Sequence, residues 1–279
     1  MKQNSSDFFL FGIDFGSNAG QRELIRQINE DPQRKPVVFC RGDAGTGKTF
    51  AALAASLSLV RGHGSKRGKY KNIYYVREPV EVGHRLGYLK GTEEDKFGPY
   101  LGPLLDNYAH LMAYGRKEGV IPMQIRQPKK KKNDDDEDDT AGYAAAYRKL
   151  PSDIIPLAPE FLRGRSFENC IIIVDEAQKL TLEEMQMLVT RIGQYTKMVI
   201  LGSPNQIDIP NVTEEDNAFV LSYQILEQTG LVGYVHLVEP MRSGFVAEFD
   251  QCFVAYKKQE AKRKAELAAE KAKLLQTKD

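Results

Sequence analysis

The chain has 279 residues, 42% of them hydrophobic, and a formal net charge of +1. This length suits one large domain with a sizeable core, and the near-zero charge neither favours nor excludes a nucleic-acid partner. No stretch approaches the roughly 20 apolar residues that span a bilayer, and the N-terminus lacks the pattern of a secretory signal. We therefore expect a cytoplasmic protein without membrane attachment. Its widely spaced cysteines, Cys40, Cys170 and Cys252, have no metal-binding spacing and are expected to be buried, reduced thiols.

Apolar runs and helical patterns alternate along the chain. We expect strands at 35–42, 71–77, 170–177, 197–202 and 233–240. We expect helices at 48–60, 93–115, 181–193 and 214–230. Thr181 and Glu184 have the spacing of a capping box, which predicts where the third helix begins. Continuously apolar strands are typical of parallel sheets, so the pattern predicts an α/β fold with helices on both faces of the sheet.

Two charged segments lie outside this alternating pattern. The stretch at about 127–142 contains the blocks KKKK and DDDEDD, which cannot offset their ordering entropy by burial, so we expect a disordered insertion. The segment 257–279 is rich in Ala, Lys and Glu and is expected to be a charged helical extension. Either segment could instead contact nucleic acid. Residues 1–256 are expected to form a single domain.

The sequence GDAGTGKT at 42–49 matches the phosphate-loop pattern G-x-x-x-x-G-K-[ST]. It directly follows a predicted strand and opens a predicted helix, which is the context that this motif requires. Backbone N–H groups of such a loop bind phosphate oxygens, the lysine reaches the terminal phosphates and the threonine ligates Mg²⁺. The expected nucleotide-binding residues are Gly42, Asp43, Ala44, Gly45, Thr46, Gly47, Lys48 and Thr49.

A pair of carboxylates, Asp175 and Glu176, ends the most apolar predicted strand. Ligands of an open parallel sheet bind at the carboxyl ends of its strands, so both acids are expected beside the phosphate loop. Asp175 would then lie near the Mg²⁺ that Thr49 helps to hold. Glu176 would point elsewhere and accept a proton from the attacking water. The alternative is that the pair simply begins a surface loop.

The pattern around the phosphate loop separates several kinds of nucleotide enzyme. A GTPase needs a guanine-reading N/T-K-x-D motif, and the sequence does not contain one. A small-molecule kinase needs a base aimed at a substrate hydroxyl, and often a lid. Water as the acceptor and ATP as the nucleotide therefore give the leading interpretation, which is ATP hydrolysis.

Several longer motifs resemble the PhoH-like ATPases, a phosphate-starvation-inducible P-loop family, across most of residues 17–256. REPVEVGHRLGYLKG at 77–91 is similar to the family's R-P-x-V-E-x-G-E-x-L-G-F-L-P-G. FLRGRSFENCIIIVDEAQ at 161–178 resembles M-R-G-R-T-x-x-N-x-x-x-I-x-D-E-A-Q, and EMQMLVTRIG at 184–193 resembles Q-M-K-M-F-L-T-R-I-G. The resemblance implies a single RecA-like core with helicase-style motifs, and ATPase activity that in some members is linked to RNA. Small stand-alone members occur in bacteriophages, and this compact chain resembles one of them. A phage protein of this kind would act in the host cytoplasm.

The sequence departs from the family pattern at the carboxyl end of the fourth predicted strand. The family's G-D-x-x-Q reads GSPNQ here, so Gln206 is retained and Ser203 replaces an aspartate. Gln206 can still sense the γ-phosphate or orient water. Because this negative charge is lost, we do not expect ATP turnover and nucleic-acid binding to be tightly coupled.

The resemblance also suggests roles for residues outside the phosphate loop. Gln21 resembles the adenine-contacting glutamine of helicase cores, and its alternative is a solvent-facing helix residue. Arg77 resembles the position that meets a nucleic-acid backbone, where Tyr74, Tyr75 and Tyr88 could stack on bases. The transition-state arginine is expected to be Arg242, or else Arg163 or Arg165 supplied in trans. Arg163 and Arg165 could instead bind a nucleic-acid backbone.

A helicase-like ATPase with one core lacks the second face that closes the nucleotide site. Identical chains arranged head to tail would provide it, so we expect a homo-oligomer, by family resemblance a hexameric ring. The leading hypothesis is an ATPase acting on RNA or single-stranded DNA. The alternative is an ATPase that remodels or signals to a protein partner without nucleic acid.

Overall fold

The structure is a computed structural model, and it describes residues 5–62, 68–78, 101–117, 150–206 and 212–241, with short helical pieces between 248 and 266. The expected insertion at 127–142, most of the expected extension at 257–279 and the site candidate Arg242 lie outside the described residues. Within the described part, no helix has the length and apolar character needed to cross a bilayer.

A parallel sheet of six strands, in the order β5-β4-β6-β7-β3-β8, forms the centre of the described molecule. Its strands are β3 (Val37–Gly42), β4 (Ile73–Arg77), β5 (Ile154–Leu157), β6 (Ile171–Asp175), β7 (Lys197–Gly202) and β8 (Val232–Leu237). A short antiparallel pair, β1 (Phe9–Leu10) and β2 (Ile13–Asp14), precedes the sheet. The predicted α/β fold with a parallel sheet is confirmed.

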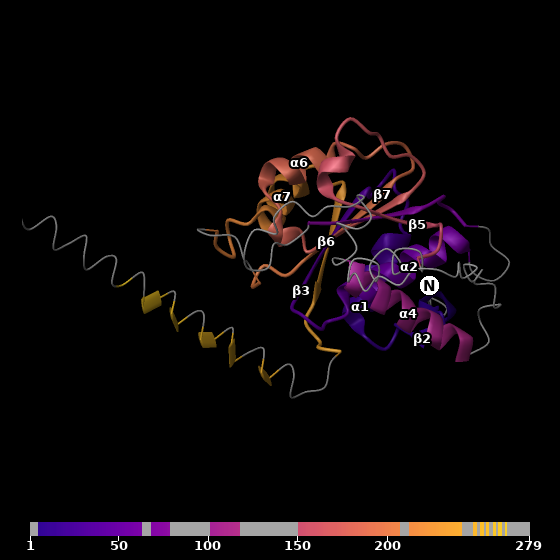
Figure 1. Cartoon of the computed structure of the whole chain (residues 1–279), viewed down its shortest axis with the longest axis horizontal. Coiled ribbons are helices and arrows are strands. Elements are labelled where there is room, and N and C mark those ends of the chain that lie inside the picture. The colour runs from indigo at the N-terminus through magenta and orange to yellow at the C-terminus, as the bar shows by residue number, and fades with distance from the viewer. Residues whose placement is uncertain are drawn as a thin grey trace, which may run out of the picture.

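Helices cover both faces of this sheet. The α-helices are α1 (Ala19–Asn29), α2 (Lys48–Arg61), α4 (Gly102–Lys117), α6 (Leu182–Val189) and α7 (Ala218–Glu227). The described residues also form the short 3-10 helices η1 (Ser5–Phe8), η3 (Pro159–Leu162) and η4 (Ala177–Lys179). α1, α2 and α4 lie on one side of the strands and α6 and α7 on the other (Figure 1).

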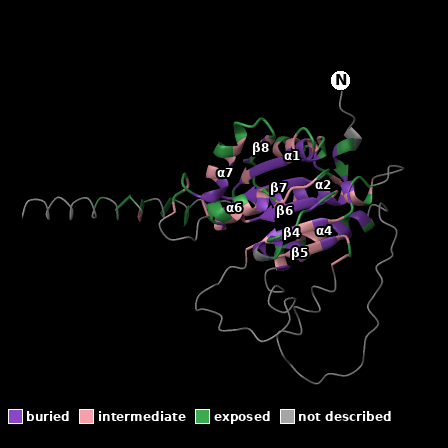
Figure 2. Ribbon diagram, turned by 90° about the horizontal axis from the view of Figure 1, so that it is seen from above, coloured by how far each residue is buried: buried purple, intermediate pink, exposed green. Residues whose placement is uncertain are grey.

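The two-sided cover explains why the strands are continuously apolar. Successive side chains of a strand point to opposite faces, and in β3 Val38 and Cys40 join the core under α1, α2 and α4, whereas Val37 and Phe39 join the core under α6 and α7. The strands accordingly form a buried band between exposed helix surfaces (Figure 2). With both faces buried, only the ends of the strands remain open to a ligand.

The structure corrects the sequence-based prediction at several elements. β5 is missing from the prediction because Pro156 interrupts it; proline cannot donate to a ladder, and β5 is accordingly an edge strand. The helix predicted at 181–193 ends at Val189, because the following turn pairs Ile192 with Phe167. Its capping box, Thr181 with Glu184, is present as predicted. Cys40 and Cys170 are buried, but Cys252 is exposed, contrary to the expectation.

Candidate nucleotide-binding site

The phosphate loop joins the end of β3 to the start of α2. Gly45 and Gly47 have φ angles of +81° and +80°, a left-handed conformation that glycine adopts without strain. A Cβ atom on Gly47 would also lie 2.5 Å from Gln21 Nε2, so a larger residue would meet a buried neighbour. The two glycines thus let the backbone turn tightly between the strand and the positive end of the helix.

Lys48, the first residue of α2, folds back over the loop that precedes it. Its Nζ atom donates to Gly42 O at 2.6 Å, to Asp43 O at 3.0 Å and to Ser203 Oγ at 2.9 Å. Burial lowers the pKa of Lys48 below its usual value, while the nearby acids act in the opposite direction. The ammonium is therefore held at the loop by neutral oxygens that phosphate oxygens can replace.

The predicted meeting of Thr49 with Asp175 is present. Thr49 Oγ1 lies 3.1 Å from Asp175 Oδ1 across the gap between α2 and the end of β6. Burial raises the pKa of Asp175 above its usual value and Glu176 adds to this effect, whereas Arg77 opposes it. These are hard oxygen donors, and Mg²⁺ is typically held by one or two such protein ligands with phosphates and water. The donor set therefore fits Mg²⁺.

The second oxygen of Asp175 faces the neighbouring strand, β4. Tyr75 donates its hydroxyl to Asp175 Oδ2 at 2.5 Å, and Arg77 NH1 lies 3.5 Å from the same oxygen. Arg77 thus faces the carboxylate, in addition to any role toward nucleic acid. The suggestion that Tyr75 stacks on bases is wrong, because the side chain is fully buried. Tyr74 packs against Phe167 on the other face, and Tyr88 lies outside the described residues.

Glu176 and Gln206 are linked through a buried amide, Gln178. Gln178 Nε2 donates to Glu176 Oε2 at 2.7 Å and to Gln206 O at 3.4 Å, and its Oε1 accepts from Ser203 N at 2.9 Å. Glu176 itself has a φ of +56°, a strained angle for a residue with a side chain. Sequence reasoning did not assign Gln178 a role, although its place two residues after Glu176 was visible.

Gln21 is buried, so the alternative of a solvent-facing residue is wrong. Its side chain is 2% exposed, and Nε2 donates to Thr46 O at 3.3 Å. The backbone N–H of Gln21 is capped by Asn18 at the start of α1. The side-chain amide of Gln21 therefore lies against the phosphate loop.

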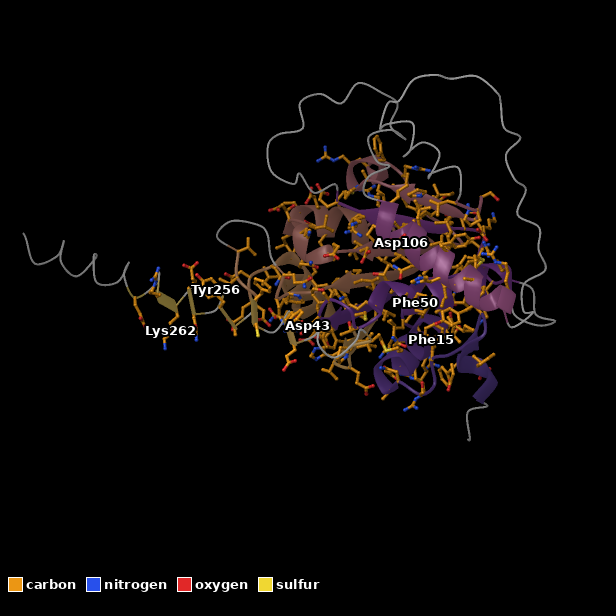
Figure 3. All side chains as sticks on the ribbon, turned by 60° about the horizontal axis from the view of Figure 1, so that its bottom comes forward. Phe15, Asp43, Phe50, Asp106, Tyr256 and Lys262 are labelled. Carbon is orange, nitrogen blue, oxygen red and sulfur yellow. The ribbon has the colours of Figure 1, made fainter. Side chains whose placement is uncertain are left out.

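A cavity of about 930 Å³ opens over these residues. It runs from the phosphate loop to the segment after β1 on one side and to α4 on the other (Figure 3 labels Phe15, Phe50 and Asp106). The predicted site residues that line it are Gln21, Ala44, Gly45, Gly47, Lys48, Thr49, Arg77, Asp175, Glu176 and Gln206. α4, which sequence reasoning did not connect to the site, contributes Asp106, Asn107, His110 and Tyr114.

Of the predicted site residues that the structure describes, Gly42, Asp43, Thr46, Arg163 and Arg165 do not line this cavity. Arg163 and Arg165 are exposed after η3, where the Arg165 guanidinium lies 5.1 Å from the centre of the Phe167 ring. Arg242 is outside the described residues. Among the described residues that line the cavity, Arg77 is the only arginine, and its NH1 atom lies 3.5 Å from Asp175 Oδ2.

Comparison with known proteins places the chain in a family. The family model described as PhoH-like protein matches residues 15–253. The chain belongs to the PhoH-like protein family. This PhoH-like chain is 33% identical over 209 residues to Protein PhoH2 of Bacillus subtilis, covering 75% of this chain and 41% of that protein. It is 30% identical over 261 residues to a PhoH-like protein of Mycobacterium tuberculosis, covering 91% of this chain and 64% of the relative.

The PhoH-like chain thus spans about two fifths to two thirds of the length of these relatives. Among solved structures it is similar to the large terminase of a thermophilic bacteriophage, with 12% identity and a TM-score of 0.47, covering 84% of this chain and 49% of the terminase. The family assignment suggested by the motifs at 77–91, 161–178 and 184–193 is confirmed.

Proposed function

We propose that this PhoH-like protein binds ATP together with Mg²⁺ and hydrolyses it, and that the cycle acts on RNA or single-stranded DNA. The observation that carries the proposal is the 3.1 Å approach of Thr49 Oγ1 to Asp175 Oδ1, beside Lys48 at the start of α2. A strand-end carboxylate, a helix-start hydroxyl and a lysine converging on a glycine loop suit a metal-bound triphosphate.

The residues of the loop would bind and orient the triphosphate. Backbone N–H groups of 43–47 and the positive end of α2 favour phosphate oxygens. Lys48 exchanges its hydrogen bonds to Gly42 O and Asp43 O for bonds to the terminal phosphates. Thr49 and Asp175 are the residues that would hold Mg²⁺, which would supply positive charge to offset the negative charge of the phosphates.

Glu176 is the residue that we propose to activate water. It lines the cavity, is partly exposed, and directly follows Asp175. Gln178 holds one Glu176 oxygen at 2.7 Å, so the other oxygen is free to accept the proton of the attacking water. We propose that Gln206, whose backbone oxygen accepts from the same amide at 3.4 Å, senses the γ-phosphate or orients that water.

The remaining parts of the proposal concern other molecules. We propose Arg242 as the arginine that stabilises the transition state, with Arg163 or Arg165 of a neighbouring copy as the alternative. The exposure of Arg163 and Arg165, away from the cavity, supports a contact with another molecule. A homo-oligomer, proposed to be a hexameric ring, would bring such an arginine to each site.

The test is the ATPase rate of the purified chain with and without RNA or single-stranded DNA, on material whose solution mass has been measured. We expect Mg²⁺-dependent hydrolysis that a polynucleotide stimulates, with the stimulation lost at high salt because phosphate contacts are salt-sensitive. Hydrolysis that no polynucleotide changes would favour action on a protein partner instead. Arg242→Ala is expected to assemble normally and lose turnover; full activity in that variant would exclude Arg242.

A further inference from the structure

Tyr75 occupies an unusual place for a polar side chain, in the middle of a strand and completely buried. Its exposed fraction is 0%, yet its hydroxyl lies 2.5 Å from Asp175 Oδ2. A buried hydroxyl is costly unless it is hydrogen-bonded, so this contact accounts for the presence of a tyrosine among apolar neighbours. The side chain is not among the residues that line the cavity.

The strand register explains how Tyr75 reaches Asp175. In the parallel pair of β4 and β6, Tyr75 lies opposite Ile173, and Arg77 lies opposite Asp175. Tyr75 is therefore the diagonal neighbour of Asp175 on the same face, a separation that an aromatic side chain spans and a shorter one does not. Tyr74, one residue earlier, points to the opposite face and packs against Phe167 with ring centres 4.7 Å apart.

The contacts divide the two oxygens of Asp175 between two tasks. Oδ2 receives the Tyr75 hydroxyl and lies 3.5 Å from Arg77 NH1. Oδ1 faces Thr49 and accepts hydrogen bonds from Thr49 Oγ1 and from the backbone N–H of Glu176, both at 3.1 Å. The terminal torsion of an aspartate has a broad energy well, so without the phenol, which makes the shortest of these contacts, the carboxylate can rotate more easily away from Thr49.

We propose that Tyr75 is a positioning residue that fixes the Asp175 carboxylate with Oδ1 turned to the metal side of the nucleotide site. The inference rests on the proposed function, because it assumes that Asp175 and Thr49 hold Mg²⁺ with ATP. In this proposal Tyr75 acts through Asp175. Removing a side chain that orients a metal ligand typically lowers metal affinity about 10- to 100-fold.

The experiment compares Tyr75→Phe with the matched control Tyr74→Phe, which removes a hydroxyl from the same strand on the opposite face. ATP binding to the full chain is measured by calorimetry in EDTA and across a titration of free Mg²⁺. For Tyr75→Phe we expect ATP affinity in EDTA within about twofold of the unmodified chain, and a rise of roughly tenfold in the Mg²⁺ concentration for half-maximal enhancement. Tyr74→Phe is expected to match the unmodified chain in both measurements.

A second background separates positioning from a general loss of packing. In Asp175→Asn, the further change Tyr75→Phe is expected to leave the Mg²⁺ dependence unchanged, because the carboxylate to be positioned is gone. An equal Mg²⁺ dependence for Tyr75→Phe and Tyr74→Phe overturns the inference while leaving the proposed function intact. If the unmodified chain binds no ATP, or binds it equally with and without Mg²⁺, the proposed function itself fails.

Discussion

The Lys48 ammonium lies 2.9 Å from the hydroxyl of Ser203, and that hydroxyl in turn donates to Gly42 O at 2.8 Å. Ser203 occupies the position at which the resembled family motif has an aspartate. The lysine of the phosphate loop is therefore held by neutral oxygens, and a carboxylate in place of the Ser203 hydroxyl would pair with it. Both side chains are buried, so the difference between a hydroxyl and a carboxylate here is felt at low dielectric.

Replacing Ser203 with aspartate should weaken ATP binding. The new carboxylate competes with phosphate for Lys48 and also meets Gly42 O without a proton to donate, so we expect affinity to fall by about 5- to 30-fold, equivalent to about 1–2 kcal/mol. Ser203→Ala, which removes the hydroxyl without adding charge, is the matched control, and its ATP affinity should stay within about threefold of that of the unmodified chain. Calorimetry with Mg²⁺ and ATP measures both, and equal affinities for the two variants would contradict the prediction.

Removing the Lys48 ammonium should abolish measurable nucleotide binding. Lys48→Ala takes away the positive charge at the loop, and a charge-assisted contact of this kind is roughly twice as strong as a neutral hydrogen bond. Lys71→Ala, at an exposed lysine before β4, controls for the loss of a positive charge. Equilibrium binding of a fluorescent ATP analogue checks both, and retained binding by Lys48→Ala would mean that the loop is not the phosphate site.

Glu176→Gln should separate binding from turnover. The amide keeps the size and the contact with Gln178 but cannot accept a proton, so ATP should remain bound while hydrolysis falls by about 10²- to 10⁴-fold. Single-turnover hydrolysis measured beside equilibrium binding tests this. Hydrolysis at the normal rate would remove Glu176 as the base.

Gln178→Ala should lower both stability and turnover. The change leaves Ser203 N without its acceptor inside the protein and releases Glu176, and an unsatisfied buried group costs about 1–3 kcal/mol. Gln186→Ala, on the exposed side of α6, is expected to change neither property. Thermal unfolding and steady-state ATPase rates give the comparison; a normal melting temperature for Gln178→Ala would argue against the bridging role.

Arg77→Ala distinguishes two roles for one arginine. If its contact with Asp175 at 3.5 Å matters, the ATPase rate without any polynucleotide should change, because a buried carboxylate loses its neighbouring positive charge. If Arg77 acts only on nucleic acid, the basal rate should stay constant and only the stimulation should fall. We expect the first result, and ATPase assays with and without single-stranded RNA separate the two.

Much of the site could be predicted because its signals are local. The eight residues 42–49 specify a loop that only glycine-rich sequence can form between a strand and a helix. The apolar run before Asp175 predicts a buried strand, and parallel strands present their carboxyl ends at one edge. Together these facts were enough to predict that Thr49 and Asp175 meet.

Other features depend on which strands become neighbours, and no local pattern encodes that choice. Tyr75 contacts Asp175 only because β4 lies beside β6 in a register that makes the two residues diagonal neighbours. Ser203 reaches Lys48 because β7 lies beside β3, and Gln21 is buried because α1 packs against α2. The sequence by itself determined the chemistry of the phosphate loop and of the paired acids. The tertiary structure alone decided which other side chains meet these groups, namely Tyr75 at Asp175, Ser203 at Lys48 and Gln21 at the loop, because packing of the whole sheet joins residues far apart in the chain.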